Sequence, residues 1–169
     1  MTIIVEDGTA KVDAETYISV VDADTYHANR GNTVWTALST AVKEQLLRKA
    51  ADYIEQAYRS RWKGIRTTST QALDWPRQNV SIEDVALRSV LPSNMVPSQV
   101  MRACAELAYR ANAGELAPDI EPRVTSEQVG PISVSYDTDL TAYVTYRAVD
   151  NMLRMLLSGG STMTKLVRT

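Results

Sequence analysis

The hydrophobic pattern of this chain is mainly helical, and its clearest stretch is 40–62. Apolar residues recur there every three or four positions, so they form one stripe along a helix while charged residues occupy the opposite face. Ser39 precedes the stripe and is a typical N-cap residue, because its hydroxyl oxygen can accept a hydrogen bond from a free N–H of the first turn. The pattern therefore predicts a helix over 40–62.

Three further stretches carry helical patterns, and each is bounded by residues that suit a helix end. Gly31 and Gly114 end two of them, Pro97 opens one, and the Gly159–Gly160 pair ends the last. The expected fold class is therefore mainly α, a bundle of about four helices. The three further helices are expected at about 20–30, 97–114 and 141–157.

Residues 123–137 change from helical to alternating periodicity. Ile132, Val134 and Tyr136 alternate with polar residues, and the Gly130–Pro131 pair before them is a turn signal. This pattern predicts a small β-hairpin near 123–137.

The rest of the chain lacks clear periodicity. Residues 1–18 are expected to form an extended arm with a brief strand, and 64–96, with its prolines and polar runs, a long loop. A chain of 169 residues is long enough for one domain with a single core. We therefore expect one helical domain at 1–157, with the long loop inside it, and a flexible C-terminal tail at 158–169.

Composition excludes several classes of site. One Cys and one His rule out an internal disulfide and a zinc site built from four Cys or His ligands. The 7 glycines form neither a dinucleotide-binding motif nor a P-loop, so we expect no cofactor and no metal. No signal peptide is apparent, and no run of about 18 apolar residues marks a transmembrane helix. We expect a protein that is not exported and has no membrane partner.

His27 is the one histidine available for general-base chemistry. Asp24, three residues earlier, could orient its ring, and Ser19 or Cys104 could act as a nucleophile. The alternative is that His27 is a half-buried helix residue and that Cys104 is a small core side chain in an alanine-rich helix. We favour this alternative and expect a protein that is not an enzyme.

A mixture of basic and aromatic residues lies at the end of the 40–62 helix. Four basic residues and one tryptophan fall within eight positions. Such a mixture suits single-stranded nucleic acid, because cations neutralise phosphates and aromatic rings stack on bases. The structural alternative is that the cations complement the helix dipole and the tryptophan closes the core, and a net charge of −2 favours it. The candidate DNA-contacting residues, called the basic cluster below, are Arg59, Arg61, Trp62, Lys63 and Arg66.

Several short motifs occur together along the chain. They are Val5-Glu6-Asp7-Gly8, Ala23-Asp24 with Tyr26-His27, Gly31-Asn32, Trp35, Arg61-Trp62-Lys63-Gly64, Gln71-Ala72-Leu73-Asp74-Trp75-Pro76-Arg77, Arg102-Ala103-Cys104-Ala105-Glu106-Leu107-Ala108 and Val129-Gly130-Pro131. With these motifs the chain resembles, over about 3–157, proteins of tailed bacteriophages and prophages described as DnaT-like single-stranded-DNA-binding proteins, which are themselves similar to head–tail connector (adaptor) proteins. The most specific block ends in Asp74, Trp75, Pro76 and Arg77, to which the resemblance gives a structural role.

The similarity to connectors implies a helical subunit of a homo-oligomeric ring, usually a dodecamer. Such a ring lies in the neck of the virion, joins the portal protein to the tail or stopper (head-completion) protein, and lets double-stranded DNA pass through its lumen without specific binding. The subunit is made in the cytoplasm of the host bacterium. In this interpretation the C-terminal segment docks on the portal. The candidate docking residues are Met163, Lys165, Leu166, Val167 and Arg168.

The DnaT-like description implies instead a replication accessory that binds single-stranded DNA through the basic cluster. An acidic net charge suits a lumen along which DNA slides better than a surface that grips DNA. We therefore expect a connector and keep single-strand binding as the alternative.

Overall fold

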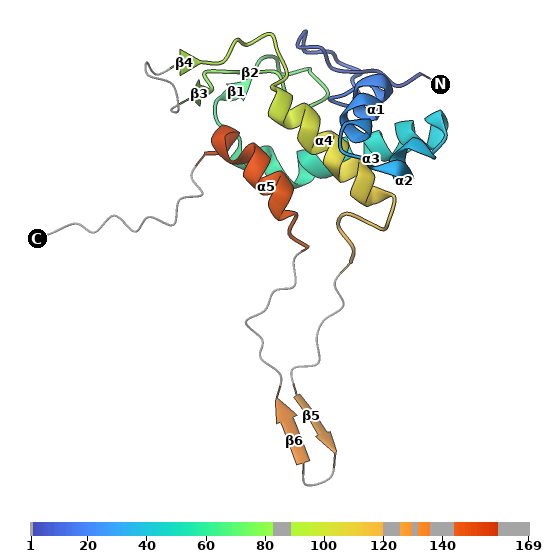
Figure 1. The fold of residues 1–169 in the computed structure, drawn as a ribbon. Helices are drawn as coiled ribbons and strands as arrows, with labels where there is room; N and C mark the ends of the chain where they lie inside the picture. Colours follow the sequence, from blue (N-terminus) through green and yellow to red (C-terminus); the bar gives the residue numbers. More distant parts are fainter. Residues whose placement is uncertain (1, 83–88, 120–125, 130–131, 136–143, 159–169) are drawn as a thin grey trace, which may run out of the picture.

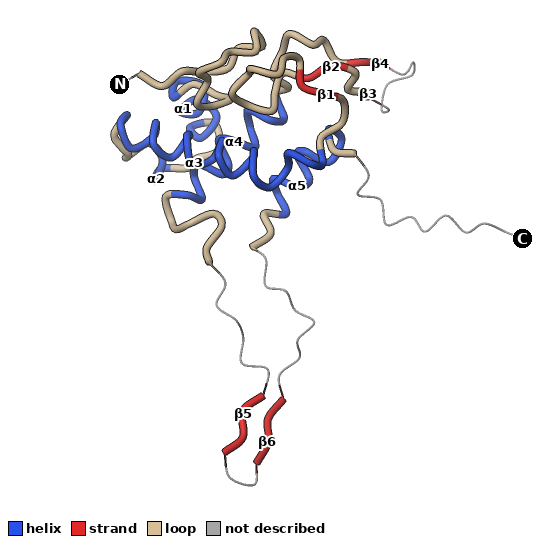
Figure 2. The backbone as a smooth tube through the Cα atoms, turned by 180° about the vertical axis from the view of Figure 1, so that it is seen from behind, coloured by secondary structure: helices blue, strands red, loops and turns tan. Residues whose placement is uncertain are grey.

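A computed structural model of the chain describes residues 2–82, 89–119, 126–129, 132–135 and 144–158. In this part of the chain the fold is mainly helical, with short antiparallel strand pairs, as the sequence predicts (Figure 1). Figure 2 shows the same helical body from behind, with several loops and the short strands between 65 and 90 gathered along one side of the helices. The core is therefore helical, and the strands lie at its periphery.

The centre of the body is formed by α3 (Thr40–Tyr58) and α4 (Ser98–Ala111), which cross each other (Figure 1). Ser39 caps α3 as predicted, because its hydroxyl accepts a hydrogen bond from the Val42 N–H at 3.4 Å. The buried face of α4 is rich in alanine, whose side chain is a single methyl group. The backbones of α3 and α4 can therefore approach closely. The buried residues of the two helices include Leu46, Leu47, Ala50, Ile54, Val100, Ala103, Leu107 and Ala108.

Two shorter helices precede α3. α1 (Val20–Ala28) packs against α3 and α4, and Ser19 caps it by accepting from the Asp22 N–H at 3.0 Å. α2 (Thr33–Thr36) is a single turn that the sequence pattern did not predict, because one turn is too short to show a periodicity. Trp35 of α2 is fully buried, so this turn closes the core beside α1.

The predicted helix over 40–62 is too long at its end. α3 stops at Tyr58, and a 3-10 turn, Arg59–Arg61, follows it. The backbone of the next residues is engaged elsewhere, because the Lys63 N–H donates to the Leu156 carbonyl at 2.9 Å. This contact with the far end of the chain replaces a further helical turn.

The predicted helix over 141–157 is shorter in the structure. α5 comprises Arg147–Leu153 and continues as a 3-10 turn, Arg154–Leu156, while 141–143 lie outside the described residues. Tyr146 precedes α5, and its hydroxyl donates to the Leu116 carbonyl at 3.0 Å. This hydrogen bond fixes the start of α5 to the segment after α4.

The region predicted as a long loop at 64–96 contains two short antiparallel strand pairs in its described residues. They were missed because a strand of two residues shows no alternation of apolar and polar positions. The pairs are β1 (Ile65–Arg66) with β2 (Arg77–Gln78), and β3 (Ser81–Ile82) with β4 (Ser89–Val90).

The predicted hairpin is confirmed. β5 (Ser126–Val129) and β6 (Ile132–Ser135) are antiparallel, with Val129 opposite Ile132. Its flanking residues 123–125 and 136–137 lie outside the described residues.

The N-terminal arm packs onto the body and folds back on itself, and the brief strand predicted within 1–18 is not formed in its described residues. A parallel bridge joins Val5 to Thr16, and Ile3, Tyr17 and Ile18 are buried. Of the predicted C-terminal tail, only Ser158 is described, so the candidate docking residues 163–168 lie outside the described part. Within the described part, no helix is both long and apolar enough to cross a bilayer.

Candidate functional site

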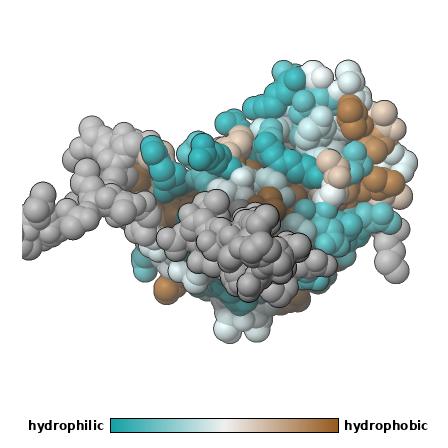
Figure 3. Space-filling view, turned by 90° about the horizontal axis from the view of Figure 1, so that it is seen from below, coloured by the Kyte–Doolittle hydropathy of each residue, from teal (hydrophilic) through white to brown (hydrophobic). Residues whose placement is uncertain are grey.

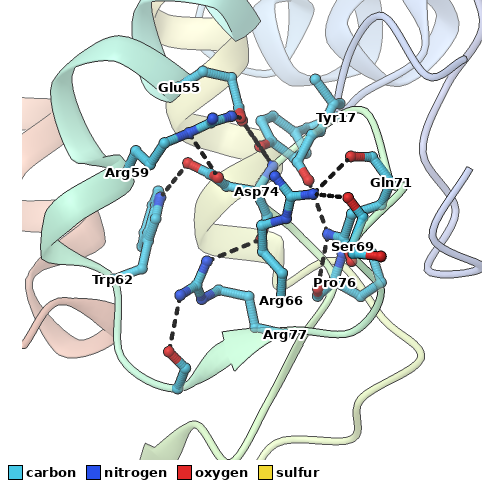
Figure 4. A network of polar contacts seen from close by, with 12 residues as sticks. Tyr17, Glu55, Arg59, Trp62, Arg66, Ser69, Gln71, Asp74, Pro76 and Arg77 are labelled. Atoms are coloured by element: carbon cyan, nitrogen blue, oxygen red, sulfur yellow. Dashed lines mark hydrogen bonds and ion pairs between the residues drawn. The ribbon is translucent and has the colours of Figure 1, made fainter. Parts of the chain in front are cut away.

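The block from Gln71 to Arg77 forms a loop that closes over the end of α3, and Asp74 is its buried centre. The Asp74 side chain is 0% exposed. Its Oδ2 accepts a hydrogen bond from Trp62 Nε1 at 3.2 Å, and its Oδ1 lies 3.2 Å from Arg59 Nε (Figure 4). One carboxylate therefore binds two members of the basic cluster.

A second carboxylate, Glu55 of α3, shares this site. The Asp74 N–H donates to Glu55 Oε1 at 2.9 Å and to the Tyr17 hydroxyl at 3.0 Å, and the Tyr17 hydroxyl in turn donates to Glu55 Oε1. Arg59 NH2 lies 2.7 Å from Glu55 Oε2. The guanidinium of Arg59 thus stands between two carboxylates. We call Tyr17, Glu55, Arg59, Trp62 and Asp74 the Asp74 network.

The electrostatics of the Asp74 network follow from its burial. Burial raises the pKa of Glu55, and the nearby Asp74 carboxylate raises it further, while the hydrogen bonds from Tyr17, Asp74 and Arg59 act against this rise. Burial and then Glu55 raise the pKa of Tyr17 above its ordinary value. The tyrosine therefore remains a hydroxyl donor across the working range of pH, which suits a structural role.

Arg77 supports the loop from the other side. Its side chain is buried and donates to three carbonyls, those of Lys63 at 2.9 Å, Gly64 at 2.8 Å and Asp74 at 3.3 Å. Burial lowers the pKa of Arg77. Arg77 thus ties the loop to the chain segment that carries the basic cluster.

The two residues between Asp74 and Arg77 complete the packing of the loop. Trp75 is fully buried and meets the ring of Trp62 edge to face, with 5.5 Å between ring centroids. The Trp75–Pro76 peptide bond is cis, and the Pro76 carbonyl accepts from Gln71 Nε2 at 3.1 Å. The block from Gln71 to Arg77, called the family block below, is therefore tightly packed both within itself and against Trp62.

The C-terminal end of the described chain joins the same region. Trp62 forms an antiparallel bridge with Leu157, and the Ser158 N–H donates to the Arg61 carbonyl at 2.6 Å. The Tyr58 hydroxyl donates to Asp150 Oδ1 of α5 at 2.8 Å. The basic cluster is thus sandwiched between the family block and the chain end.

Every member of the basic cluster has an intramolecular partner. Trp62 is 4% exposed, whereas the side chains of Arg59 and Arg61 are 55% and 49% exposed. Arg61 lies over the Tyr58 ring at 5.3 Å and 4.0 Å from Asp150 Oδ1. Arg66 NH2 donates to the Ser69 carbonyl at 2.8 Å, and Lys63 Nζ to the Ser81 carbonyl at 3.4 Å. The cluster is brought together, but its aromatic ring does not face solvent.

His27 lies in the core with both ring nitrogens engaged. Its Nε2 lies 3.1 Å from the Ala105 carbonyl and its Nδ1 lies 3.0 Å from Asn32 Nδ2, so Nε2 carries the proton and Nδ1 accepts. Burial lowers its pKa. Asp24, which could have oriented the His27 ring in an enzyme, instead accepts from Trp35 Nε1 at 2.7 Å and pairs with Lys43.

Cys104 is equally enclosed. Its side chain is 0% exposed, and burial raises its pKa to about 11. Its Sγ lies 3.6 Å from Thr16 Oγ1 and 3.8 Å from the Leu47 carbonyl oxygen, so its polar contacts among the described residues are with neither Ser19 nor His27. In the described residues no group of His, Cys, Asp and Glu is arranged to hold a metal ion.

The sequence did not reveal the structural roles of three polar side chains, those of Glu55, Tyr17 and Glu6. Glu55 was placed on the polar face of its helix and Tyr17 in the arm, with no signal that they meet. Glu6 is 2% exposed and accepts from the N–H groups of Gly8, Ala10 and Lys11 at 2.8, 3.0 and 2.8 Å. The Glu-Asp-Gly turn signal could have indicated this last loop.

Comparison with known proteins places the chain in a family. A family model described as "Putative DnaT-like ssDNA binding protein" matches residues 1–169. The chain belongs to this DnaT-like family. No curated protein and no solved structure matches it. The family description agrees with the DnaT-like part of the resemblance seen in the sequence motifs.

Proposed function

We propose that this DnaT-like protein is a non-enzymatic subunit of a ring in the neck of a tailed phage, joining the portal to the tail or stopper protein. The observation that carries the proposal is the internal use of the basic cluster. Trp62, the one aromatic ring of the cluster, is 4% exposed and bonded to Asp74. A groove for single-stranded DNA needs such a ring free to stack on bases.

The cations of the cluster argue in the same direction. Arg59 pairs with two carboxylates, and Lys63 and Arg66 donate to backbone carbonyls. A cation that already has a carboxylate partner gains less from a phosphate, because the first ion pair must be broken. The contacts of the cluster therefore support a structural role for its residues. We expect the protein to act through contacts between its surface and other proteins.

That surface carries apolar side chains where a subunit contact would need them. Val21 of α1 is 73% exposed and Val34 of α2 is 51% exposed. In the view from below, hydrophobic residues gather toward the end of the body where Figure 1 places α1 and α2, with hydrophilic residues beside them (Figure 3). Exposed apolar patches rimmed by polar residues are typical of protein contacts.

The test is assembly in the presence of the portal protein encoded in the same genome. The full chain is mixed with purified portal, and the masses of the complexes are measured by native mass spectrometry. We expect a ring, a dodecamer, bound to the portal, and no complex with the portal of an unrelated phage. A protein that stays monomeric and never binds its portal contradicts the proposal.

The C-terminal segment gives this test a sharper form. A chain with Leu166 and Val167 replaced by Ala is expected to lose portal binding while keeping the helical content and unfolding midpoint of the wild type. The matched control carries Ala at the exposed Val12, at the other end of the chain. Equal portal binding by both variants would remove the docking role from the C-terminal segment.

Single-stranded DNA binding is a second candidate, because the family description names it. Arg61 has a half-exposed side chain and is the member of the cluster best placed to meet a phosphate. We would measure the anisotropy of a labelled oligonucleotide at low salt with wild type, Arg61→Ala and, as a control, Arg30→Ala. Binding that falls with salt and with Arg61→Ala alone would favour this candidate, and absence of binding would eliminate it.

A further inference from the structure

A hollow on the body is lined by polar side chains that have no partner among the described residues. It measures about 260 Å³ and lies between α3 and the segment after α4. Asp52 and Gln56 of α3 are one helical turn apart on its wall, and Glu115 faces them from the other segment. None of these three forms an ion pair or hydrogen bond in the described part of the chain.

The rest of the lining shows that the hollow is firmly built. Tyr53 and Leu116 give it an apolar floor, and both are held by Tyr146. The Tyr146 ring lies 5.4 Å from that of Tyr53, and its hydroxyl donates to the Leu116 carbonyl at 3.0 Å. Burial alone raises the pKa of Asp52, as expected for a carboxylate without a counter-ion. With Lys49 also at its edge, the hollow carries one excess negative charge.

The outer face of α5 has the opposite character. Arg147, Asn151 and Arg154 are exposed and stand at positions i, i+4 and i+7, so they form one stripe. The inner face holds α5 in place through the buried Val149 and Leu153. Neither arginine forms an ion pair with another described residue, and neither pairs with the hollow of its own chain.

We propose that the α5 stripe of one copy of this chain binds the hollow of a second copy, with Arg147 and Arg154 pairing with Asp52 and Glu115. Asn151, between the two arginines on the stripe, is available to bond the Gln56 amide in this contact. The occupant is a second copy because both halves of a complementary pair are found on one chain. The inference rests on the proposed ring function and gives it a subunit interface.

A contact between two different patches is heterologous, and such contacts close into rings when the rotation between subunits allows it. The expected charge pairs lie at the edge of an apolar floor, where they contribute to register and to the choice of partner. If both stripe–hollow pairs instead form about a two-fold axis, the contact is isologous and gives a dimer, so the mass of the assembly distinguishes the two arrangements.

The experiment is a charge swap measured in the portal assembly mixture. One variant carries Asp52→Lys and Glu115→Lys, and the other carries Arg147→Glu and Arg154→Glu. We expect each variant alone to lose assembly, with its subunit contact weakened about tenfold or more, because like charges then face each other. An equimolar mixture of the two variants is expected to assemble again, since each hollow meets a stripe of opposite charge.

The matched controls are Arg102→Glu and Asp13→Lys, which change the same charges at exposed positions outside both patches. Circular dichroism of all variants reports folding. Variants that assemble like wild type, or a mixture that stays unassembled, overturn this interface while the ring function stands. Wild-type protein that does not assemble with its portal contradicts the ring function, and the interface with it.

Discussion

Trp62 donates its indole N–H to the buried carboxylate of Asp74 over 3.2 Å, which joins a residue chosen from sequence as a DNA contact to the family block. The two residues lie on either side of the β1 strand and the turn that follows it. Because of this contact Trp62 is a core residue, although its position among basic residues in the sequence is typical of nucleic-acid binding.

Replacement of Asp74 by Ala is expected to lower the free energy of unfolding by about 3 kcal/mol, because Trp62 Nε1 loses its acceptor and Arg59 loses one of two carboxylates. Asp74→Asn keeps an acceptor oxygen and is expected to cost less. Urea unfolding followed by circular dichroism measures both. Asp13→Ala is the control, since Asp13 is exposed, and its change should stay within about 0.5 kcal/mol.

Gly64 and Gly31 form a matched pair for testing how closely the main chain after the family block approaches Gly64. Both have a left-handed backbone, with φ of 67° and 70°. A Cβ at Gly64 would lie 2.1 Å from the Gln78 carbonyl oxygen, whereas a Cβ at Gly31 meets nothing within 4 Å. Gly31→Ala is expected to cost about 1 kcal/mol from backbone strain alone. Gly64→Ala is expected to cost about 2 kcal/mol more, and equal losses would contradict the packing of β1 against β2.

Cys104 provides a chemical probe of unfolding. Its thiol is buried with a pKa of about 11, so at pH 8 only a small fraction is thiolate and reagents cannot reach it. Alkylation by iodoacetamide, followed by intact mass, is expected to be at least about a hundredfold slower in the native protein than in concentrated urea. Rapid labelling without urea would show that α4 does not enclose the thiol.

His27 gives a pH dependence whose sign follows from its burial. Its folded pKa lies below the unfolded value of 6.5, so the unfolded chain binds more protons as the pH falls through that value. Stability is therefore expected to fall from about pH 7.5 to about pH 5.5, by no more than about 1.4 kcal/mol per pH unit.

The matched variant for this titration is His27→Gln, whose side chain does not titrate. Its unfolding free energy is expected to vary less over the same pH range, even though its absolute stability is lower. The raised pKa of Glu55 acts in the opposite direction, toward greater stability at low pH, and it is present in both proteins. Identical pH profiles would show that His27 is not buried as a neutral ring.

The sequence predicted those parts of the fold that depend on local periodicity. The stripe along α3, its Ser39 cap and the alanine-rich α4 are read from neighbours three or four positions apart, and the structure has them within a few residues of the expected bounds. The alternation around Ile132 and Val134 likewise predicted the β5–β6 pair. Each of these elements could be predicted because its own residues show the periodicity of a helix or a strand.

The Asp74 network could not be predicted in this way, because its contacts join distant positions. Glu55 has the spacing of a solvated residue, yet its side chain is only 13% exposed because the family block covers it. Tyr17 and Asp74 lie 57 positions apart. A structural role for Trp62 was one of two open alternatives, and nothing local distinguished them.

The bridge between Trp62 and Leu157 also bears on how the protein is made. The main chain at 61–63 is bonded to residues 156–158, so this closing contact forms only after nearly the whole described chain has left the ribosome. Contacts of such long sequence separation are formed late and slow the folding of a domain. Until then the main chain at 61–63 lacks its partners at 156–158, although Trp62 can already pack against Tyr58, Asp74 and Trp75.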